Sequence, residues 1–130
     1  MWLLKTEPSD YSYEDLENEG KAIWDGVKNH QAVNNMKKMK KGEKVFFYHT
    51  GRKHREIVAI CEVSRESYEY EDYTVVEVSP VGKLNRPVTL KEIKSDDFFA
   101  EWALVRQSRL SVVPVKKEYW NKIIEMSEEE

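Results

Sequence analysis

Three kinds of side chain that nucleic-acid-binding proteins use lie close together in residues 23–49, which read IWDGVKNHQAVNNMKKMKKGEKVFFYH. Trp24 offers an aromatic face on which an unstacked base can lie, and Asn29 offers an amide that can bond to the edge of a base. A cluster of lysines follows, and lysines attract phosphate groups. The stretch therefore indicates a surface that meets a ring and an anion. A buried tryptophan and an ordinary capped helix also explain these residues, so that alternative stays open.

The basic residues are concentrated in the same region, although the chain as a whole is acidic. Its 130 residues carry a net charge of −3 at pH 7. Residues 28–55 contain nine Lys or Arg and one acid, a charge of +8, and the remainder, with 12 basic and 23 acidic residues, has a charge of −11. This asymmetry hints at one anion-facing side, although a solvated helix end and loop would give the same count. The candidate phosphate-binding residues are Lys37, Lys38, Lys41, Arg52, Lys53 and Arg55.

Catalytic and metal-binding patterns are absent from the sequence. Cys61 is the single cysteine and lies in the apolar run IVAICEV, where a buried thiol is inert. The histidines His30, His49 and His54 lack the spacing of metal ligands, and no C-x-x-C, H-E-x-x-H or G-x-x-x-x-G-K motif occurs. We therefore expect a protein that is not an enzyme, with no catalytic residue, no metal and no cofactor.

Hydrophobic periodicity predicts short helices inserted between strands. Strands are expected at residues 2–4, 21–24, 43–50, 57–65, 73–78, 84–88 and 110–115, and helices at 13–16, 29–40, 90–94, 96–104 and 116–126. Ser9 or Asp10 is expected to cap the first helix, and Asn29 the second. Pro80 and Gly82 are expected to interrupt the fifth strand, whose alternating side chains predict one solvent-facing side.

Elements of this kind in this order predict an α+β fold, with the sheet curled towards a barrel. A chain of 130 residues without repeats or linkers is expected to form one domain, residues 1–130. No apolar run approaches the roughly 18 residues of a membrane span, and no signal peptide is expected at the N-terminus. With one unpaired cysteine, these features favour a cytoplasmic protein, or a nuclear one in a eukaryote, and a monomer rather than a dimer.

Several blocks of the sequence occur in the order typical of one known family. They are WLLKTEPSDYSYEDL, WDGVKNHQAVNNMKKMKKGEKVFFYHTG, IVAICEV, RPVTLKEIK, LVRQSRLSVVPV and EYW. Together they cover nearly the whole chain, which strongly resembles the EVE domain family. The resemblance implies a PUA-like fold, a mixed β pseudo-barrel with short helices between the strands, related to YTH and ASCH domains. It also implies the recognition of a modified base in DNA or RNA.

The resemblance assigns candidate residues to a base-binding pocket. The loop that follows the first strand is implied to line it, with Thr6 where the family commonly has Ser. Trp24 is implied to form one wall, because related YTH readers use this tryptophan in an aromatic cage. The residues implied to contact the nucleobase are Lys5, Thr6, Glu7, Trp24, Asp25, Asn29, Tyr48, Gln107 and Arg109. Two positions depart from the family, since His30 stands where Tyr is common and Val33 stands where Arg is common, which removes a cation.

We therefore predict a non-catalytic module that binds DNA or RNA carrying a modified base, with the base stacked on Trp24 beside the basic residues of 37–55. Two alternatives stay open. An enzyme or sensor could act on a small nucleobase-like ligand in the same pocket, with a pH optimum set by Glu7 or His49. A protein-interaction adaptor could instead use the acidic segments 66–72 and 128–130.

Overall fold

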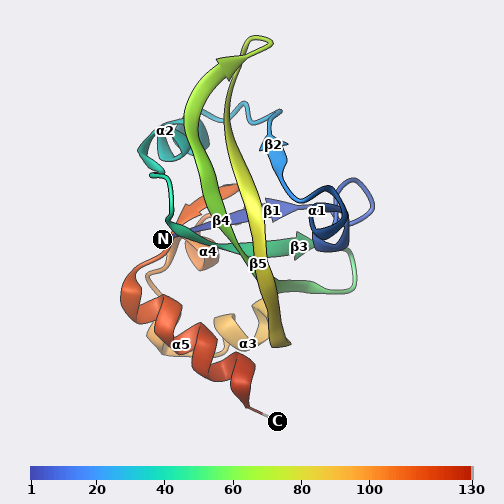
Figure 1. The fold of residues 1–130 in the computed structure, drawn as a ribbon. Helices are drawn as coiled ribbons and strands as arrows, with labels where there is room; N and C mark the ends of the chain where they lie inside the picture. The colour runs from blue at the N-terminus through green and yellow to red at the C-terminus, as the bar shows by residue number, and fades with distance from the viewer. Residues whose placement is uncertain (130) are drawn as a thin grey trace.

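A six-stranded mixed sheet with the strand order β2-β5-β4-β3-β1-β6 organises the fold (Figure 1). The computed structural model describes residues 1–129. The strands are β1 (Trp2–Thr6), β2 (Ala22–Trp24), β3 (Lys44–Thr50), β4 (Arg55–Tyr70), β5 (Tyr73–Thr89) and β6 (Val112–Pro114). The helices are α1 (Tyr13–Glu19), α2 (His30–Lys38), α3 (Leu90–Lys94), α4 (Ala103–Arg106) and α5 (Lys117–Glu128), with a short 3-10 helix η1 (Asp97–Phe99). The α+β class predicted from the sequence is confirmed, and Glu130, the end of the second acidic segment, lies outside the described residues.

Strand β1 lies inside the sheet and joins segments from distant parts of the chain. It runs parallel to β3 and antiparallel to β6. The remaining pairs are antiparallel, including the hairpin of β3 and β4. Register shifts within the β3–β4 and β4–β5 pairs mark irregularities that bend and twist the strands, and so curl the sheet. The parallel pair places Lys5 opposite Tyr48 and Thr6 opposite His49, at the edge where the candidate site lies.

Strand β5 is longer than the sequence predicted. It continues through Pro80 and Gly82, so the expected interruption at these residues is wrong. Pro80 lies opposite Cys61 at a register shift, and an irregularity of this kind tolerates a proline, which cannot donate a backbone hydrogen bond. The solvent-facing side expected at the start of β5 is also wrong. Residues 74–78 are buried without a break because β5 lies between β2 and β4 and contacts α1 and α2.

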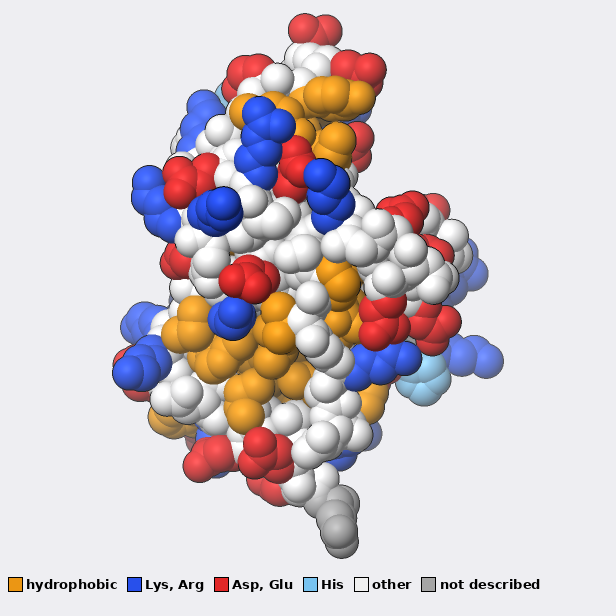
Figure 2. All heavy atoms as spheres, viewed as in Figure 1, with side chains coloured by type: hydrophobic (Ala, Val, Ile, Leu, Met, Phe, Trp, Pro, Cys, Tyr) orange, Lys and Arg blue, Asp and Glu red, His pale blue; other side chains and the backbone are white. Residues whose placement is uncertain are grey.

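The β4–β5 hairpin extends beyond the rest of the sheet (Figure 1). Its turn is formed by Glu71 and Asp72, whose φ angles are 47° and 68°. Acidic side chains gather at this tip on the face shown in Figure 2, whereas hydrophobic side chains gather lower down, where α5 lies against β5. The first acidic segment is therefore exposed at the end of a projecting hairpin.

Side-chain caps determine where several helices begin. Asn29 caps α2 as predicted, through a 3.0 Å hydrogen bond that it accepts from the first turn. Ser12 caps α1 in place of the expected Ser9 or Asp10, because Ser12 and Asp15 form a reciprocal capping box. The expected helix at 96–104 is broken into η1 and α4, and α2 ends at Lys38 rather than near residue 40. No helix within residues 1–129 is long and apolar enough to cross a membrane.

Aromatic residues fill the core on both faces of β3. Phe47 meets Tyr13 edge-on, with 5.3 Å between the ring centroids, and Phe46 stacks on Trp120 at 3.8 Å. Both phenylalanines are fully buried. Cys61 is fully buried as predicted, and burial raises the pKa of its thiol. These contacts make β3 the rigid support for the side chains at its end.

His49 joins the end of β3 to the start of α1 and makes stability depend on pH. Its Nε2 accepts a hydrogen bond from the backbone N–H of Tyr13 at 3.2 Å, which requires that nitrogen to be unprotonated. Burial lowers the pKa of His49 below its ordinary value of 6.5, against the opposing effect of Glu56 and Glu7. The folded protein therefore binds this proton less readily than the unfolded chain does. The contribution of unprotonated His49 to the stability of the fold is fully present above pH 6.5 and is lost as the pH falls through the lowered pKa of His49.

We expect the wild type to lose more thermal stability than His49→Gln when the pH is lowered from about 7.5 to about 5. The glutamine can offer an oxygen to the same N–H but does not titrate. Thermal unfolding followed by circular dichroism at a series of pH values measures the difference. Parallel curves for the two proteins would show that His49 contributes nothing to the pH dependence.

Candidate functional site

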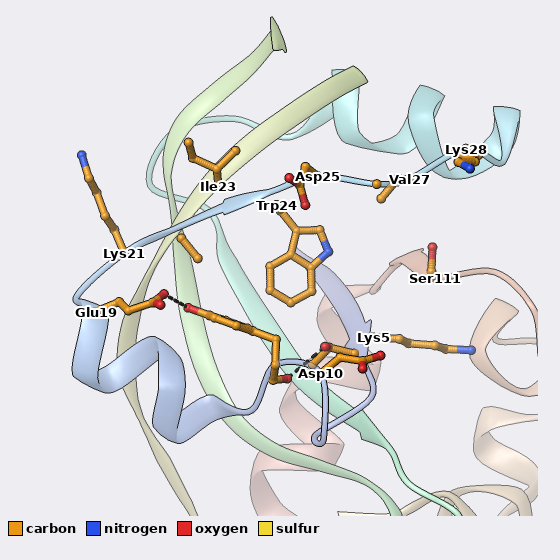
Figure 3. Close-up of a pocket in the computed structure, with 14 residues that line it drawn as sticks. Lys5, Asp10, Glu19, Lys21, Ile23, Trp24, Asp25, Val27, Lys28 and Ser111 are labelled. Atoms are coloured by element: carbon orange, nitrogen blue, oxygen red, sulfur yellow. Dashed lines mark hydrogen bonds between the residues drawn. The ribbon is translucent and has the colours of Figure 1, made fainter. Parts of the chain in front are cut away.

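A hollow of about 630 Å³ opens between the end of β1, the loop that leads to α1, and the segment that starts with β2 (Figure 3). We call it the Trp24 hollow. Its lining residues are Lys5, Thr6, Asp10, Tyr11, Glu19, Lys21, Ala22, Ile23, Trp24, Asp25, Gly26, Val27, Lys28 and Ser111. Ser111 joins this group because the chain just before β6 runs beside β1, where the Lys5 backbone N–H donates to the Ser111 carbonyl at 3.0 Å.

Trp24 projects from the end of β2 into the centre of the hollow (Figure 3). Its ring is partly buried, and two aromatic neighbours meet it edge-on. The ring centroid of Tyr11 lies 6.2 Å away and that of Phe47 lies 5.6 Å away, each with an interplanar angle of 84°. Edge-on contacts fix the plane of a ring without stacking a parallel ring on its face. The indole is therefore held by two rings, neither of which stacks in parallel on its face.

The indole N–H of Trp24 differs from those of the core tryptophans. Trp2 donates its N–H to Glu43 at 3.1 Å, and Trp102 donates to the Pro114 carbonyl at 2.9 Å. Within the described part of the chain, the N–H of Trp24 has no hydrogen-bond acceptor, and neither has that of the partly buried Trp120, whose ring stacks on Phe46 outside the hollow. A buried tryptophan usually satisfies this donor. The contrast favours a side chain that faces a ligand over one that only fills the core.

Hydrogen bonds within the loop between β1 and α1 form the floor of the hollow. The backbone N–H groups of Asp10 and Tyr11 both donate to the Glu7 carbonyl at 2.9 Å. The Thr6 hydroxyl donates to the Tyr11 carbonyl at 2.9 Å, and the Tyr11 hydroxyl donates to the Glu19 carboxylate at 2.6 Å. Burial and the bond to Glu19 raise the pKa of the Tyr11 hydroxyl, which therefore stays protonated. These bonds hold the Tyr11 ring beside the indole.

The rest of the lining combines apolar walls with charges of both signs. Ile23 and Val27 supply apolar surface, and Asp25 supplies carboxylate oxygens that accept hydrogen bonds from amino groups. Lysines at the rim supply donors and positive charge. No three His, Cys, Asp or Glu side chains among residues 1–129 come together as ligands for a metal ion. The arrangement suits a flat ring with polar edges and a nearby anion.

The nucleobase residues implied by the family resemblance are only partly gathered in this hollow. Lys5, Thr6, Trp24 and Asp25 line it. Glu7 does not line it. The Glu7 carboxylate instead accepts hydrogen bonds from the backbone N–H of Ser9 at 3.0 Å and from the Ser9 hydroxyl at 2.9 Å. Those two bonds, the backbone one first, lower the pKa of Glu7, which serves here to tighten the turn.

The remaining nucleobase residues lie in two smaller hollows nearby. Tyr48 lines one of about 260 Å³, which shares Lys5 with the Trp24 hollow. Asn29, Gln107 and Arg109 line another of about 300 Å³ at the start of α2. The structure therefore distributes eight of the nine sequence-predicted nucleobase residues over three hollows and leaves Glu7 outside them.

Tyr11 and Val27 are among the lining residues that the sequence did not predict. Tyr11 belongs to the block WLLKTEPSDYSYEDL, and Val27 belongs to WDGV, so both were within segments that the resemblance had singled out. The signal for Tyr11 was its place directly after the turn made by Pro8, where a side chain leaves the strand direction. Its role depends on the closure of the loop, which residue types alone do not reveal.

The candidate phosphate-binding residues lie at opposite ends of β3. Lys37, Lys38 and Lys41 precede the strand, whereas Arg52, Lys53 and Arg55 follow it. The strand has seven residues, which separates its two ends by about 20 Å. Lys37, Lys38 and Lys41 line none of the four hollows. Arg52, Lys53 and Arg55 all line an open surface at the other end of β3. The contiguous basic segment of the sequence is thus two surfaces in space.

The curled α+β sheet, with a hollow built on a tryptophan at a strand end, defines a PUA-like module. The YTH domain of Zygosaccharomyces rouxii MRB1, solved with N6-methyladenosine RNA, shares this fold at a TM-score of 0.59 and 14% identity, covering 99% of this chain and 84% of that one. More specifically, the chain belongs to the EVE domain family, whose model matches residues 1–126.

Relatives of known name or structure are similar over nearly the whole chain. Human thymocyte nuclear protein 1 is 29% identical over 167 residues, covering 99% of this chain and 74% of that protein. The crystal structure of human THYN1 protein in complex with DNA containing 5-methylcytosine has a TM-score of 0.92 at 28% identity, covering 99% and 98% of the two chains. Protein Atu2648 from Agrobacterium tumefaciens has a TM-score of 0.93 at 35% identity, covering 98% and 92%. The resemblance inferred from the sequence blocks is confirmed.

Proposed function

We propose that the protein is a non-catalytic module that binds one modified base of DNA or RNA in the Trp24 hollow. The observation that carries the proposal is the indole of Trp24, which is held edge-on by two aromatic rings and has an open face in a hollow of about 630 Å³. A single base stacked on an aromatic ring in a protein pocket gains about 1–3 kcal/mol from that contact. A hollow of this size accepts one base with room for a substituent.

The edge of the base would meet groups of both hydrogen-bonding types. The Asp25 carboxylate would accept a hydrogen bond from an exocyclic amino group, and the Thr6 hydroxyl oxygen has a lone pair left after donating to the Tyr11 carbonyl. The apolar side chains of Ile23 and Val27 would contact a methyl group on the base. Selectivity for a modified base would come from this apolar contact and from the lower cost of extracting a base that already pairs or stacks poorly.

The relatives support the proposal without deciding the ligand. Human THYN1 protein was crystallised with DNA that contains 5-methylcytosine, and the YTH domain with RNA that contains N6-methyladenosine. We extend the shared feature, a methylated base within a nucleic acid, to this chain. In the same proposal Glu7 keeps the loop closed, and Tyr48, Asn29, Gln107 and Arg109 contact the nucleotides beside the bound base.

The proposal also covers the organisation of the chain. Residues 1–130 would act as one domain and as a monomer, in the cytoplasm of a prokaryote or in the nucleus of a eukaryote, in keeping with the word nuclear in the name of the human relative. Arg52, Lys53 and Arg55 would contact phosphates near the bound base. Lys37, Lys38 and Lys41 would contact only a nucleic acid long enough to reach along β3.

We expect at least one oligonucleotide with a modified base to bind roughly tenfold more tightly than its plain counterpart, because one methyl group in an apolar pocket distinguishes ligands by about this factor. The panel consists of short single- and double-stranded oligonucleotides carrying 5-methylcytosine or N6-methyladenine, each with its unmodified control. Intrinsic fluorescence suits the titration because, of the four tryptophans, Trp24 lines the hollow and Trp2, Trp102 and Trp120 do not. All titrations use one salt concentration.

Equal affinity across every modified and plain pair would contradict the proposal and leave a basic surface without base selectivity. Mass spectrometry of the modified nucleosides after incubation with the protein tests the enzymatic alternative. An altered nucleoside would replace the binding module with an enzyme that uses the same hollow.

A further inference from the structure

A second hollow lies on the other side of Lys5 and contains only positive charge. Its volume is about 260 Å³, and its charged lining residues are Lys5, Arg55 and Lys94. We call it the cation hollow. A shallow open surface of about 680 Å³ adjoins it through the shared Arg55 and Lys94, and adds Lys91 and the basic side chains of the β3–β4 turn. No carboxylate lines either space.

The cations of this hollow lack the carboxylate partners that several other cations of the molecule have. Arg86 binds Glu92 through two parallel hydrogen bonds of 3.0 Å, and Arg106 binds Glu101 at 2.7 Å. In contrast, Lys5, Arg55 and Lys94 have no carboxylate within 4.0 Å among residues 1–129. Uncompensated cations in a concave site raise the local concentration of anions. An acidic chain that leaves three cations unpaired in one hollow has the charge pattern of an anion site.

Lys5 is the most constrained of the three. Its Nζ donates to the Ser108 carbonyl at 3.0 Å and lies 5.7 Å from the ring centroid of Tyr48. Burial, together with Arg55 and Lys94, lowers the pKa of the Lys5 amine to about 8, so most of the amine is charged at neutral pH. An ammonium group has three donors, and only one is used here. The other two remain for an anion, whose charge would offset the repulsion among the cations.

The position of Lys94 is fixed by contacts on the far side of α3. Thr89 and Glu92 cap this helix reciprocally, and Glu92 is the partner of Arg86 on β5. The hydrogen bonds with Arg86, followed by those with Thr89, hold the pKa of Glu92 below its usual range. A helix anchored in this way presents Lys94 to the hollow at a defined position.

We propose that the cation hollow binds a phosphate group through Lys5, Arg55 and Lys94. The Lys5 side chain extends away from the Trp24 ring, so its backbone borders one hollow and its amine borders the other (Figure 3). The phosphate is that of the nucleotide whose base lies on Trp24, or of its direct neighbour in the strand. This assignment to a phosphodiester rests on the proposed function, whereas the binding of a phosphate group does not.

The test compares Lys94→Gln with Lys117→Gln, a matched change on α5, where an exposed lysine lines none of the hollows. The probes are inorganic phosphate, followed by backbone amide shifts in NMR spectra, and a trinucleotide titrated at several salt concentrations. We expect Lys94→Gln to weaken binding of the trinucleotide roughly fivefold and to reduce the salt slope by about 0.7, the value for one lost phosphate contact on a single strand. It should also remove the phosphate-induced shifts around α3, and Lys117→Gln should change neither result.

Equal effects of the two substitutions on both probes would overturn the proposal. So would a triple change of Lys37, Lys38 and Lys41 to glutamine that weakens the trinucleotide as much as Lys94→Gln does, because the phosphate would then lie at the other end of β3. A different result would show that the proposed function is wrong while the phosphate site is right. In that case Trp24→Ala leaves trinucleotide binding intact while Lys94→Gln still weakens it.

Discussion

Replacement of Trp24 by alanine is expected to lower the affinity for the preferred modified oligonucleotide by about 1–3 kcal/mol, which is roughly 5- to 150-fold. The reason is the loss of the indole surface at the centre of the hollow, on which neither Tyr11 nor Phe47 stacks in parallel. Fluorescence anisotropy of a labelled oligonucleotide measures the effect without relying on the tryptophan signal. The discrimination between modified and plain oligonucleotides should disappear together with the affinity.

Two further measurements separate lost stacking from lost structure. Trp24→Phe keeps an aromatic face and should recover a large part of the affinity, although phenylalanine stacks less extensively than indole. Thermal unfolding of each variant reports whether the fold persists. An alanine variant that folds and binds as tightly as the wild type would remove Trp24 from the binding surface and return it to the core.

Replacement of Phe47 by alanine is expected to have the largest effect on stability, a loss of about 3–5 kcal/mol in the free energy of unfolding. Phe47 is fully buried and touches Tyr13, Trp24 and His49 edge-on. The cavity left by its ring would be lined by these three side chains. Because a domain of this size is stable by only about 5–15 kcal/mol, the loss should appear as a large shift of the unfolding midpoint in denaturant.

The matched control for this change is Phe99→Ala. Phe99 is also fully buried, but its ring packs against Phe98, Trp102 and Tyr119 instead of the hollow. Both variants should lose similar stability, whereas only Phe47→Ala should also weaken oligonucleotide binding at a temperature where both are folded. Unchanged binding in folded Phe47→Ala would show that the indole does not need this support.

Local patterns in the sequence predicted much of the fold because local interactions determine those features. Asn29, for example, caps α2 through a bond within the first turn of the same helix. The course of β5 through Pro80 could not be predicted, since it depends on a register shift in a strand that pairs from about 20 residues away. The true cap of α1, Ser12, was overlooked because Ser9 and Asp10 are equally good caps by residue type.

The candidate site was predictable to the extent that its residues lie in one segment. Trp24 and Asp25 come from a single block, and both line the hollow. Lys94 was not anticipated, because α3 reaches Lys5 only through the pairing of β4 with β5 and the packing of α3 against both. The basic residues of 37–55 were likewise predicted as one surface because they are neighbours in the sequence. In the structure, the length of β3 separates them into two surfaces.

The interior position of β1 has a consequence for the order in which the molecule assembles. Its partners are β3, about 40 residues later, and β6, whose residue Pro114 lies opposite Trp2. Pairings between such distant segments slow folding, because a long loop must close before any contact rewards it. The β4–β5 hairpin, in contrast, is local and can form early. Strand β1 can therefore pair with β3 first, but it gains its second partner only when β6, about 110 residues after it, has been made. The hollow that borders Lys5 and Ser111 is complete only at that point.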